Sequence, residues 1–310
     1  MVQFYSESHY ENDIIELFKN MGYHYVYGSD IENREPTSPL YEEILLDSLC
    51  KINKTLPLSA IQEAINKLKD IENGSLEQQN SIFTDYLQNG IAVHYIENNE
   101  KYDKIVYLID YSKPNNNSFI ITNQLRIVGK SPKRLDVLLF INGLPLVLME
   151  LKSPSRENTD VSEAYRQIQN YKKEISSVFI YNAICVMSDG IISKAGTITS
   201  SEDRFMAWKS TDGSYENTKY AQYDTFFKGI FQKERLLDII KNFICFSYLN
   251  GEPKIKVLAG YHQYFAVKKL LRQMAKVVLY GILKGVVNHF LWYFMLNCYK
   301  RKFKVQQLLY

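Results

Sequence analysis

The chain has 310 residues, enough to bury a substantial core and to form about two structural units. Its composition, 46% hydrophobic and 23% charged, is ordinary for a globular protein. The four cysteines lie far apart, with no Cys-x2-Cys pair and no clustered histidines, which argues against a zinc site or a disulfide framework and for a reducing compartment. The N-terminus lacks the basic and apolar segments of a secretory signal peptide, so we expect a cytoplasmic location.

The net charge of +3 is unevenly distributed along the chain. Residues 273–310 carry six Lys/Arg and no acidic residue, which leaves 31 basic and 34 acidic residues in 1–272, a net charge of −3. Such an asymmetry is often typical of a nucleic-acid-binding arm. The codons of this tail favour a different interpretation, which depends on the family that the chain resembles.

The first ninety residues are predicted to be helical, because apolar residues recur at helical spacing and helix-stop signals follow them. The expected helices cover residues 8–21, 40–53, 58–71 and 76–88. The pattern then changes to alternation, with β-branched and aromatic residues separated by turn signals. Five strands are expected in an antiparallel meander, at 91–96, 104–111, 118–128, 134–141 and 144–152.

A crossover helix over 159–175 and a buried strand over 177–190 follow this meander. Helices, a meander, a crossover helix and another strand together predict an α/β unit with a mixed β-sheet flanked by helices. Residues 231–246 and 259–273 are predicted to be helical, which gives the fold a helical C-terminal extension.

Two charged residues stand at the end of an apolar strand in "GLPLVLMELKSP", residues 143–154. Glu150 and Lys152 are two positions apart and share one face of the strand, and Asp136 lies on the preceding strand. Two converging carboxylates suit Mg²⁺, and a lysine beside them can stabilise charge on a phosphate, which is the set that phosphodiester hydrolysis requires. The alternative is a solvated ion pair at a strand end.

Two further observations favour a site. The charges interrupt an apolar strand rather than a polar loop, and Gln167 and Tyr171 lie at i and i+4 on the next helix, beside the same strand end.

The turn at Asn142-Gly143 decides whether the two carboxylates can meet. A two-residue turn pairs residue 141 with 144 and sets Asp136 opposite Met149, so that Glu150 faces the other way. A three-residue loop pairs 141 with 145 and sets Asp136 opposite Glu150. We predict this loop or an equivalent one-residue bulge, and a strict hairpin without a bulge would exclude the metal site.

These segments resemble a known family. "TNQLRIVG", "KRLDVLLFINGLPLVLMELKSP", "AYRQIQNY", "VMSDG" and "RFMAWKS", in this order, resemble the N-terminal nuclease domain of the restriction (R) subunit of type I restriction–modification enzymes, a PD-(D/E)xK nuclease with a restriction-endonuclease-like core. The resemblance covers most of residues 8–270. It implies a nuclease domain over residues 1–230, a helical linker over 231–272 that leads toward a motor domain, and an unrelated tail over 273–310.

The resemblance also implies roles for individual residues. Asp136 and Glu150 match the metal-binding carboxylates, Lys152 the catalytic lysine, and Gln167 and Tyr171 the Gln-x3-Tyr motif that supports cleavage. Glu11 on the first helix resembles an additional acidic residue near the metal, although a solvated helix face explains it equally well. The family's Pro-Asp is Leu135-Asp136 here.

Gln263, in "GYHQYFAV", resembles a residue that approaches the adenine of ATP ahead of a P-loop. No Gly-x4-Gly-Lys-Ser/Thr sequence occurs in this chain, so no ATP hydrolysis or translocation is expected from it.

The expected partners are double-stranded DNA and the methyltransferase and specificity subunits of a type I complex, with Mg²⁺ as cofactor. The leading interpretation is an Mg²⁺-dependent DNA endonuclease domain. Two others remain open: a non-cleaving module that docks on the methyltransferase core or on DNA, and a membrane-anchored protein.

The membrane interpretation rests on residues 277–299, which are apolar and precede a basic cluster, but Lys284, Asn288 and His289 interrupt them. The genetic code offers another account. Codons permitted for Tyr280 to His289, read from the third base of each, spell Trp-His-Thr-Gln-Gly-Ser-Gly-Lys-Ser, the P-loop that the family would carry here. We therefore expect that the reading frame shifts near residues 271–275 and that 273–310 is an out-of-frame tail without a membrane role.

Overall fold

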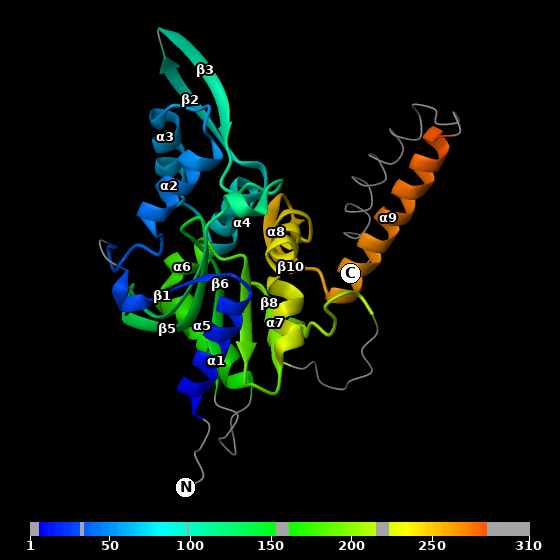
Figure 1. Ribbon diagram of the computed structural model, residues 1–310. Coiled ribbons are helices and arrows are strands. Elements are labelled where there is room, and N and C mark those ends of the chain that lie inside the picture. Colours follow the sequence, from blue (N-terminus) through cyan, green and yellow to red (C-terminus); the bar gives the residue numbers. More distant parts are fainter. Residues whose placement is uncertain (1–5, 32–33, 98, 153–160, 215–222, 284–310) are drawn as a thin grey trace. The chain divides into compact units, whose positions relative to one another are not determined.

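The structure is a computed structural model that describes residues 6–31, 34–97, 99–152, 161–214 and 223–283 (Figure 1). The chain divides into two compact units, Met1–Gly260 and Tyr261–Tyr310. In the first unit, a six-stranded mixed sheet with helices on both faces confirms the predicted α/β class. The second unit contains α9 (Tyr261–Leu283), which confirms the helix expected over 259–273. Residues 284–310, with Lys284, Asn288, His289 and Cys298, lie outside the described residues.

The sheet has the strand order β1-β4-β5-β6-β7-β8. The meander of β4 (Phe119–Val128), β5 (Pro132–Ile141) and β6 (Leu144–Leu151) is antiparallel as predicted. β1 (His24–Tyr27) runs parallel to β4, and β7 (Ile184–Ser188) runs parallel to β6. β8 (Ser193–Gly196) closes the sheet antiparallel to β7.

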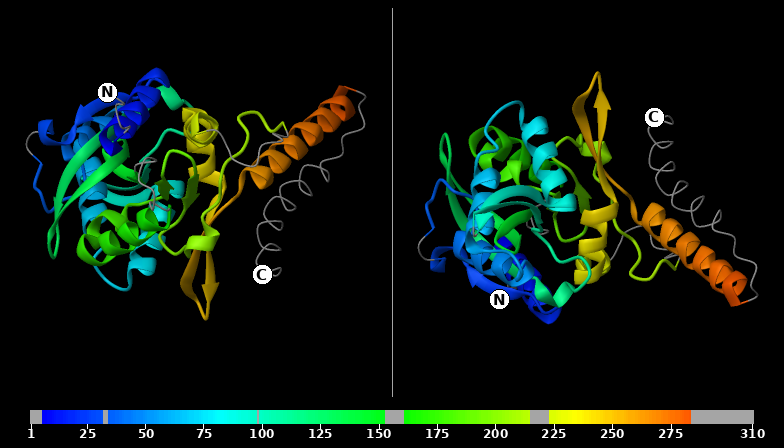
Figure 2. Two further views of the ribbon diagram at one scale, coloured as in Figure 1. Left: turned by 90° about the horizontal axis from the view of Figure 1, so that it is seen from below. Right: turned by 90° about the horizontal axis from the view of Figure 1, so that it is seen from above.

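Helices α1 (Glu7–Asn20) and α5 (Val161–Glu174) pack on opposite faces of this sheet (Figure 2). On β7, Met187 packs in one core cluster with the α5 residues Ile168 and Tyr171, whereas the neighbouring Ser188 hydroxyl bonds the Tyr10 hydroxyl of α1 at 2.6 Å. Successive strand residues point to opposite faces, so α5 covers the side of Met187 and α1 covers the side of Ser188.

Among the remaining helices of the first unit, the sequence predicts α2 (Glu42–Ile52), α3 (Leu58–Lys69), α4 (Leu76–Asn89) and α8 (Lys233–Asn242). It does not predict α6 (Ser176–Ile180) or α7 (Tyr223–Phe231). Short 3-10 turns occur at Gly28–Asp30, Pro114–Asn116 and Glu202–Arg204. Capping boxes, Ser6 with His9 on α1 and Ser75 with Gln78 on α4, satisfy free N–H groups at two helix starts.

Four sequence expectations are wrong in detail. β2 (Ile91–Glu97) and β3 (Glu100–Val106) form a separate hairpin outside the main sheet, and no strand continues over 107–111. β1 was not expected. The strand predicted over 177–190 is instead the helix α6 followed by β7. Between them, the side-chain amide of Asn182 donates to the Ile184 carbonyl. The helix predicted over 231–246 ends at Asn242, and β9 (Ile244–Leu249) and β10 (Glu252–Leu258) form a hairpin.

The β5–β6 hairpin has a two-residue turn rather than the predicted three-residue loop. Asn142 and Gly143 both have positive φ, 53° and 78°, the geometry that matches the twist of a tight hairpin. Pairing runs from Ile141↔Leu144 through Phe140↔Pro145 to Leu139↔Val147, so Leu146 is an extra residue. This is the alternative that we predicted, a one-residue bulge. Continued past Val137↔Met149, the register sets Asp136 opposite Glu150.

Among the residues that the structure describes, no helix is long and apolar enough to cross a membrane.

Candidate active site

The bulged hairpin brings Asp136, Glu150 and Lys152 together at the end of β6. The Nζ atom of Lys152 lies 2.5 Å from Oε1 of Glu150 and 3.0 Å from the Leu151 carbonyl oxygen. The backbone N–H of Leu151 donates to Oδ2 of Asp136 at 2.8 Å. The backbone N–H of Lys152 donates to the Ser188 carbonyl at 2.8 Å, which extends the pairing with β7 beyond the last residue of β6. All three side chains are therefore anchored to the sheet.

These groups perturb one another strongly. Burial raises the pKa of Asp136 well above its usual range, and the charge of Glu150 raises it further. Burial also raises the pKa of Glu150, although Lys152 opposes this effect. Burial alone would lower the pKa of Lys152, but Glu150 and Asp136 outweigh it and raise the pKa. Two carboxylates thus share one ammonium, and the site favours additional positive charge.

One oxygen of this site has no partner. Glu150 is 2% exposed, and its Oε2 atom is buried without a hydrogen bond, whereas Oε1 is held by Lys152. A buried carboxylate oxygen without a donor is costly, and a hard cation would satisfy it. The described residues contain no group of three or more His, Cys, Asp or Glu that could hold a metal. The residues fit Mg²⁺ only as a two-carboxylate site whose other ligands are water or substrate oxygens.

Helix α5 places Tyr171 over the same site. Tyr171 is 3% exposed, and its hydroxyl donates to the carbonyl of Arg134, two residues before Asp136 on β5, at 3.1 Å. Burial raises the pKa of this hydroxyl, as does the nearby charge of Glu150, while a hydrogen bond with Gln167 lowers it. The structure thus brings Tyr171 to the carboxylates, and Gln167 lies beside Tyr171 on the same helix.

Glu11 lies on α1, and amides occupy both of its oxygens. Asn123 donates to Oε1 at 2.5 Å, and Gln124 donates to Oε2 at 2.6 Å. Burial raises the pKa of Glu11, and these two hydrogen bonds partly offset the rise. The metal role of Glu11 stays a prediction.

The acidic residue of α1 whose charge acts on the site is Glu7. It raises the pKa of Asp136 and of Lys152, although it is not the largest influence on either. Sequence reasoning missed Glu7, yet its signal was present, since residues four apart on a helix share a face and Glu7 precedes Glu11 by four.

Gln263 belongs to α9 in the second unit, whereas the residues of the site belong to the first unit. Its predicted adenine contact stays a prediction. The sequence Gly129-Lys130-Ser131 forms the turn between β4 and β5 and lacks the helix that a phosphate-binding loop requires.

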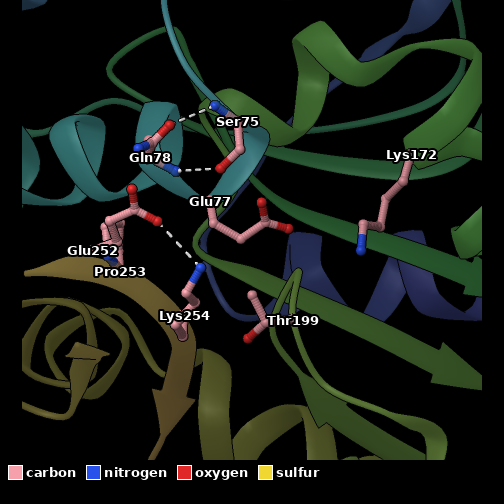
Figure 3. Close-up of a pocket in the computed structure, with 8 residues that line it drawn as sticks. All are labelled: Ser75, Glu77, Gln78, Lys172, Thr199, Glu252, Pro253 and Lys254. Carbon is pink, nitrogen blue, oxygen red and sulfur yellow. Dashed lines mark hydrogen bonds and ion pairs between the residues drawn. The ribbon is translucent and has the colours of Figure 1, made fainter. Parts of the chain in front are cut away.

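The hollow that Figure 3 shows lies elsewhere on the first unit. It has a volume of about 520 Å³ and is bordered by the Ser75–Gln78 capping box and by the Glu252–Lys254 ion pair. The predicted site residues are not among those that line it. The candidate site is instead a cluster of buried and half-buried charged groups at the strand ends.

Comparison with known proteins identifies the family. The family described as "Type I restriction enzyme R protein N terminus" matches residues 4–204. The chain belongs to this family. The HindI endonuclease subunit of a type I restriction enzyme from Haemophilus influenzae is 34% identical over 275 residues, 84% of this chain and 26% of that protein. The MjaIXP endonuclease subunit from Methanocaldococcus jannaschii is 30% identical over 298 residues, 87% of this chain and 28% of that protein.

A further relative, the EcoprrI endonuclease subunit from Escherichia coli, is 27% identical over 256 residues. As a member of the R protein N-terminal family, the chain spans about a quarter of the length of the HindI and MjaIXP subunits. The matched residues 4–204 include Glu7, Asp136, Glu150, Lys152 and Tyr171, so the whole candidate site lies within the family's segment.

Proposed function

We propose that this chain is the endonuclease part of a type I restriction enzyme R subunit and that it hydrolyses phosphodiester bonds of double-stranded DNA with Mg²⁺. The observation that carries the proposal is the Leu146 bulge, because it sets Asp136 opposite Glu150, a buried carboxylate whose Oε2 atom has no hydrogen-bond partner. Membership of the R protein family and the names of the relatives support the same reaction class.

The residues of the site have separate tasks in this proposal. Asp136 and Glu150 would hold the cation, which when bound polarises a phosphate oxygen and makes water a stronger nucleophile. Lys152 lowers the pKa of Glu150 against the effect of burial and places an ammonium beside the reacting phosphate, where negative charge develops. Tyr171 and Gln167 hold α5 against the strand end and exclude water from the buried side of Glu150.

A basic surface supports DNA as the substrate. We define the hairpin cations as Arg126, Lys130, Lys133 and Arg134, at the end of β4–β5. Arg126 and Arg134 are directly opposite each other on adjacent strands, an arrangement that is unfavourable for like charges. The ion pairs among the described residues include none of the hairpin cations. DNA phosphates bound by Arg126 and Arg134 would relieve this repulsion, and Arg134 is only two residues from Asp136.

The proposal also covers partners and context. The methyltransferase and specificity subunits would supply sequence recognition, and the complex would act in the cytoplasm. These 310 residues would not hydrolyse ATP. The alternative function is a docking module that binds the methyltransferase core or DNA without cleaving it.

Cleavage of supercoiled plasmid by the 310-residue chain tests the proposal. Glu150→Gln and Lys152→Ala should abolish Mg²⁺-dependent nicking and retain DNA binding, because they remove a cation ligand and the ammonium but leave the DNA-contacting surface. Glu16→Gln is the matched control, since Glu16 is an exposed acid of α1. Thermal unfolding of each variant shows that it is folded.

The double substitution Arg126→Ala/Arg134→Ala should instead weaken DNA binding and reduce its salt dependence by about two phosphate contacts. A wild-type chain that binds DNA and never cleaves it with Mg²⁺ or Mn²⁺ would support the docking module and refute the nuclease.

A further inference from the structure

Strand β4 contains a backbone break beside the candidate site. Gln124, in the middle of β4, has φ of +54°, a left-handed conformation that residues other than glycine rarely adopt. Pairing with β5 is regular on both sides, at Asn123↔Val137 and Leu125↔Leu135. The residue of β5 opposite Gln124 is therefore Asp136. A strained residue in a strand persists only where its surroundings hold it there.

The break turns two neighbouring side chains toward one partner. Successive residues of a regular strand point to opposite faces, yet Asn123 and Gln124 both donate to Glu11. Asn123 also accepts a hydrogen bond from the Tyr25 hydroxyl of β1 at 2.9 Å. We call Glu11, Asn123 and Gln124 the Glu11 clamp. It joins α1 to β4 at Gln124, the residue that lies opposite Asp136 of β5.

We propose that Glu11 is a positioning residue: through the Glu11 clamp it holds the left-handed turn at Gln124 and so fixes the segment of β5 that carries Asp136. The inference rests on the proposed nuclease function, in which Asp136 is a cation ligand. It differs from a direct metal role for Glu11, because here Glu11 acts through the two amide donors that its oxygens bind. Glu7 is then the acid of α1 that acts on the site by its charge.

A glycine at position 124 distinguishes a positioning role of Glu11 from direct binding of the cation by Glu11. Glycine adopts positive φ without strain, so a Gln124→Gly chain can keep the turn without the clamp. Valine loses the same amide and in addition resists positive φ, since it is β-branched. If Glu11 acts through the turn, glycine at 124 makes Glu11 largely dispensable. If Glu11 binds the cation, position 124 has no influence on the effect of replacing Glu11.

The experiment is a double-mutant cycle on Mn²⁺ and Mg²⁺ affinity, measured by titration calorimetry on the 310-residue chain without DNA. Glu11→Gln and Gln124→Val should each weaken binding by about tenfold, as is typical when a partner of a ligand-bearing segment is lost. Gln124→Gly should change it by less than about threefold, and Glu11→Gln should add less than about threefold in that background. Glu16→Gln is the control on the same helix, and binding is measured well below each variant's unfolding temperature.

The outcomes are distinguishable. An equal loss from Glu11→Gln in both backgrounds overturns the positioning role and assigns Glu11 to the cation. Unchanged affinity in Glu11→Gln and Gln124→Val overturns it as well. A wild-type chain that binds neither cation refutes the proposed function itself, and the positioning role with it.

Discussion

Two lysines of this protein, one half-buried and one buried, have opposite electrostatic environments. Lys152 lies against two carboxylates, which raise the pKa of its ammonium. Lys256 of β10 is 2% exposed, and its Nζ atom donates to the Asn80 side-chain oxygen and to the Asn182 carbonyl, both at 2.8 Å. Without a carboxylate partner, burial lowers the pKa of Lys256 to about 7. Lys152 therefore stays a cation that can stabilise negative charge, whereas Lys256 serves as a structural hydrogen-bond donor.

Lys256 should make stability depend on pH. Above the unfolded pKa of 10.5 the amine is neutral in both states. As the pH falls from about 10.5 to about 7, the amine is protonated in the unfolded chain but stays neutral in the folded chain, so the free energy of unfolding falls. Below pH 7 this contribution is constant. Urea unfolding at pH 7 and pH 9 should show a wild-type chain more stable at pH 9, and Lys256→Met should lose most of that difference. An unchanged difference in Lys256→Met would contradict a neutral Lys256.

At the scale of the element, the turn of the β5–β6 hairpin carries both the register and the site. Asn142 is fully buried, and its side-chain oxygen accepts the Ser118 N–H at 2.8 Å. Its amide group donates to the Leu108 carbonyl and to the Asn117 side-chain oxygen. A Cβ on Gly143 would lie 2.4 Å from the Tyr41 carbonyl oxygen, so only glycine fits there. The turn is thus fixed by its surroundings as well as by its own residues.

Asn142→Ala should destabilise the chain by about 2–4 kcal/mol, because it removes three hydrogen bonds, leaves the buried Leu108 carbonyl without this donor and keeps a positive φ. The β9–β10 hairpin offers a matched control, since Asn250-Gly251 has the same two-residue turn with φ of 53° and 81° and lies exposed. Asn250→Ala carries the backbone penalty alone and should cost about 1 kcal/mol. Equal losses in chemical denaturation would show that the buried hydrogen bonds of Asn142 contribute nothing.

At the scale of the whole molecule, the chain corresponds to about a quarter of the HindI and MjaIXP subunits. The site of the proposed nuclease lies within the compact unit Met1–Gly260, and Gln263 lies in the other unit. The tail over 273–310 is mostly outside the described residues, so its interpretation rests on the codons that the genetic code permits for its residues.

The reading frame of this tail can be tested on the gene. We expect the codons for Tyr280 to His289, read from the third base of each, to spell Trp-His-Thr-Gln-Gly-Ser-Gly-Lys-Ser. The physical reason is that a P-loop lysine and serine hold phosphates and Mg²⁺, so a family member with a motor needs them at this place. Genomic DNA sequencing over codons 265–300 gives the answer. Codons that do not spell this motif exclude the frame shift.

The sequence by itself predicted the candidate site residues and the helices that flank them. Helical spacing of Ile168 and Tyr171 predicted the buried face of α5, and the interruption of an apolar strand by Glu150 and Lys152 predicted a charged strand end. These signals are local, because helix periodicity and strand alternation act over a few residues. Local patterns also predicted that an extra residue must enter the hairpin.

The tertiary structure alone decided where that residue goes and what surrounds the site. The bulge is at Leu146 rather than in the turn, because contacts from distant segments fix Asn142 and Gly143 in a two-residue geometry. The left-handed residue at Gln124, the engagement of Glu11 by two amides and the influence of Glu7 on Asp136 depend on α1 packing beside β4. Such contacts join residues more than a hundred positions apart, and no local pattern encodes them.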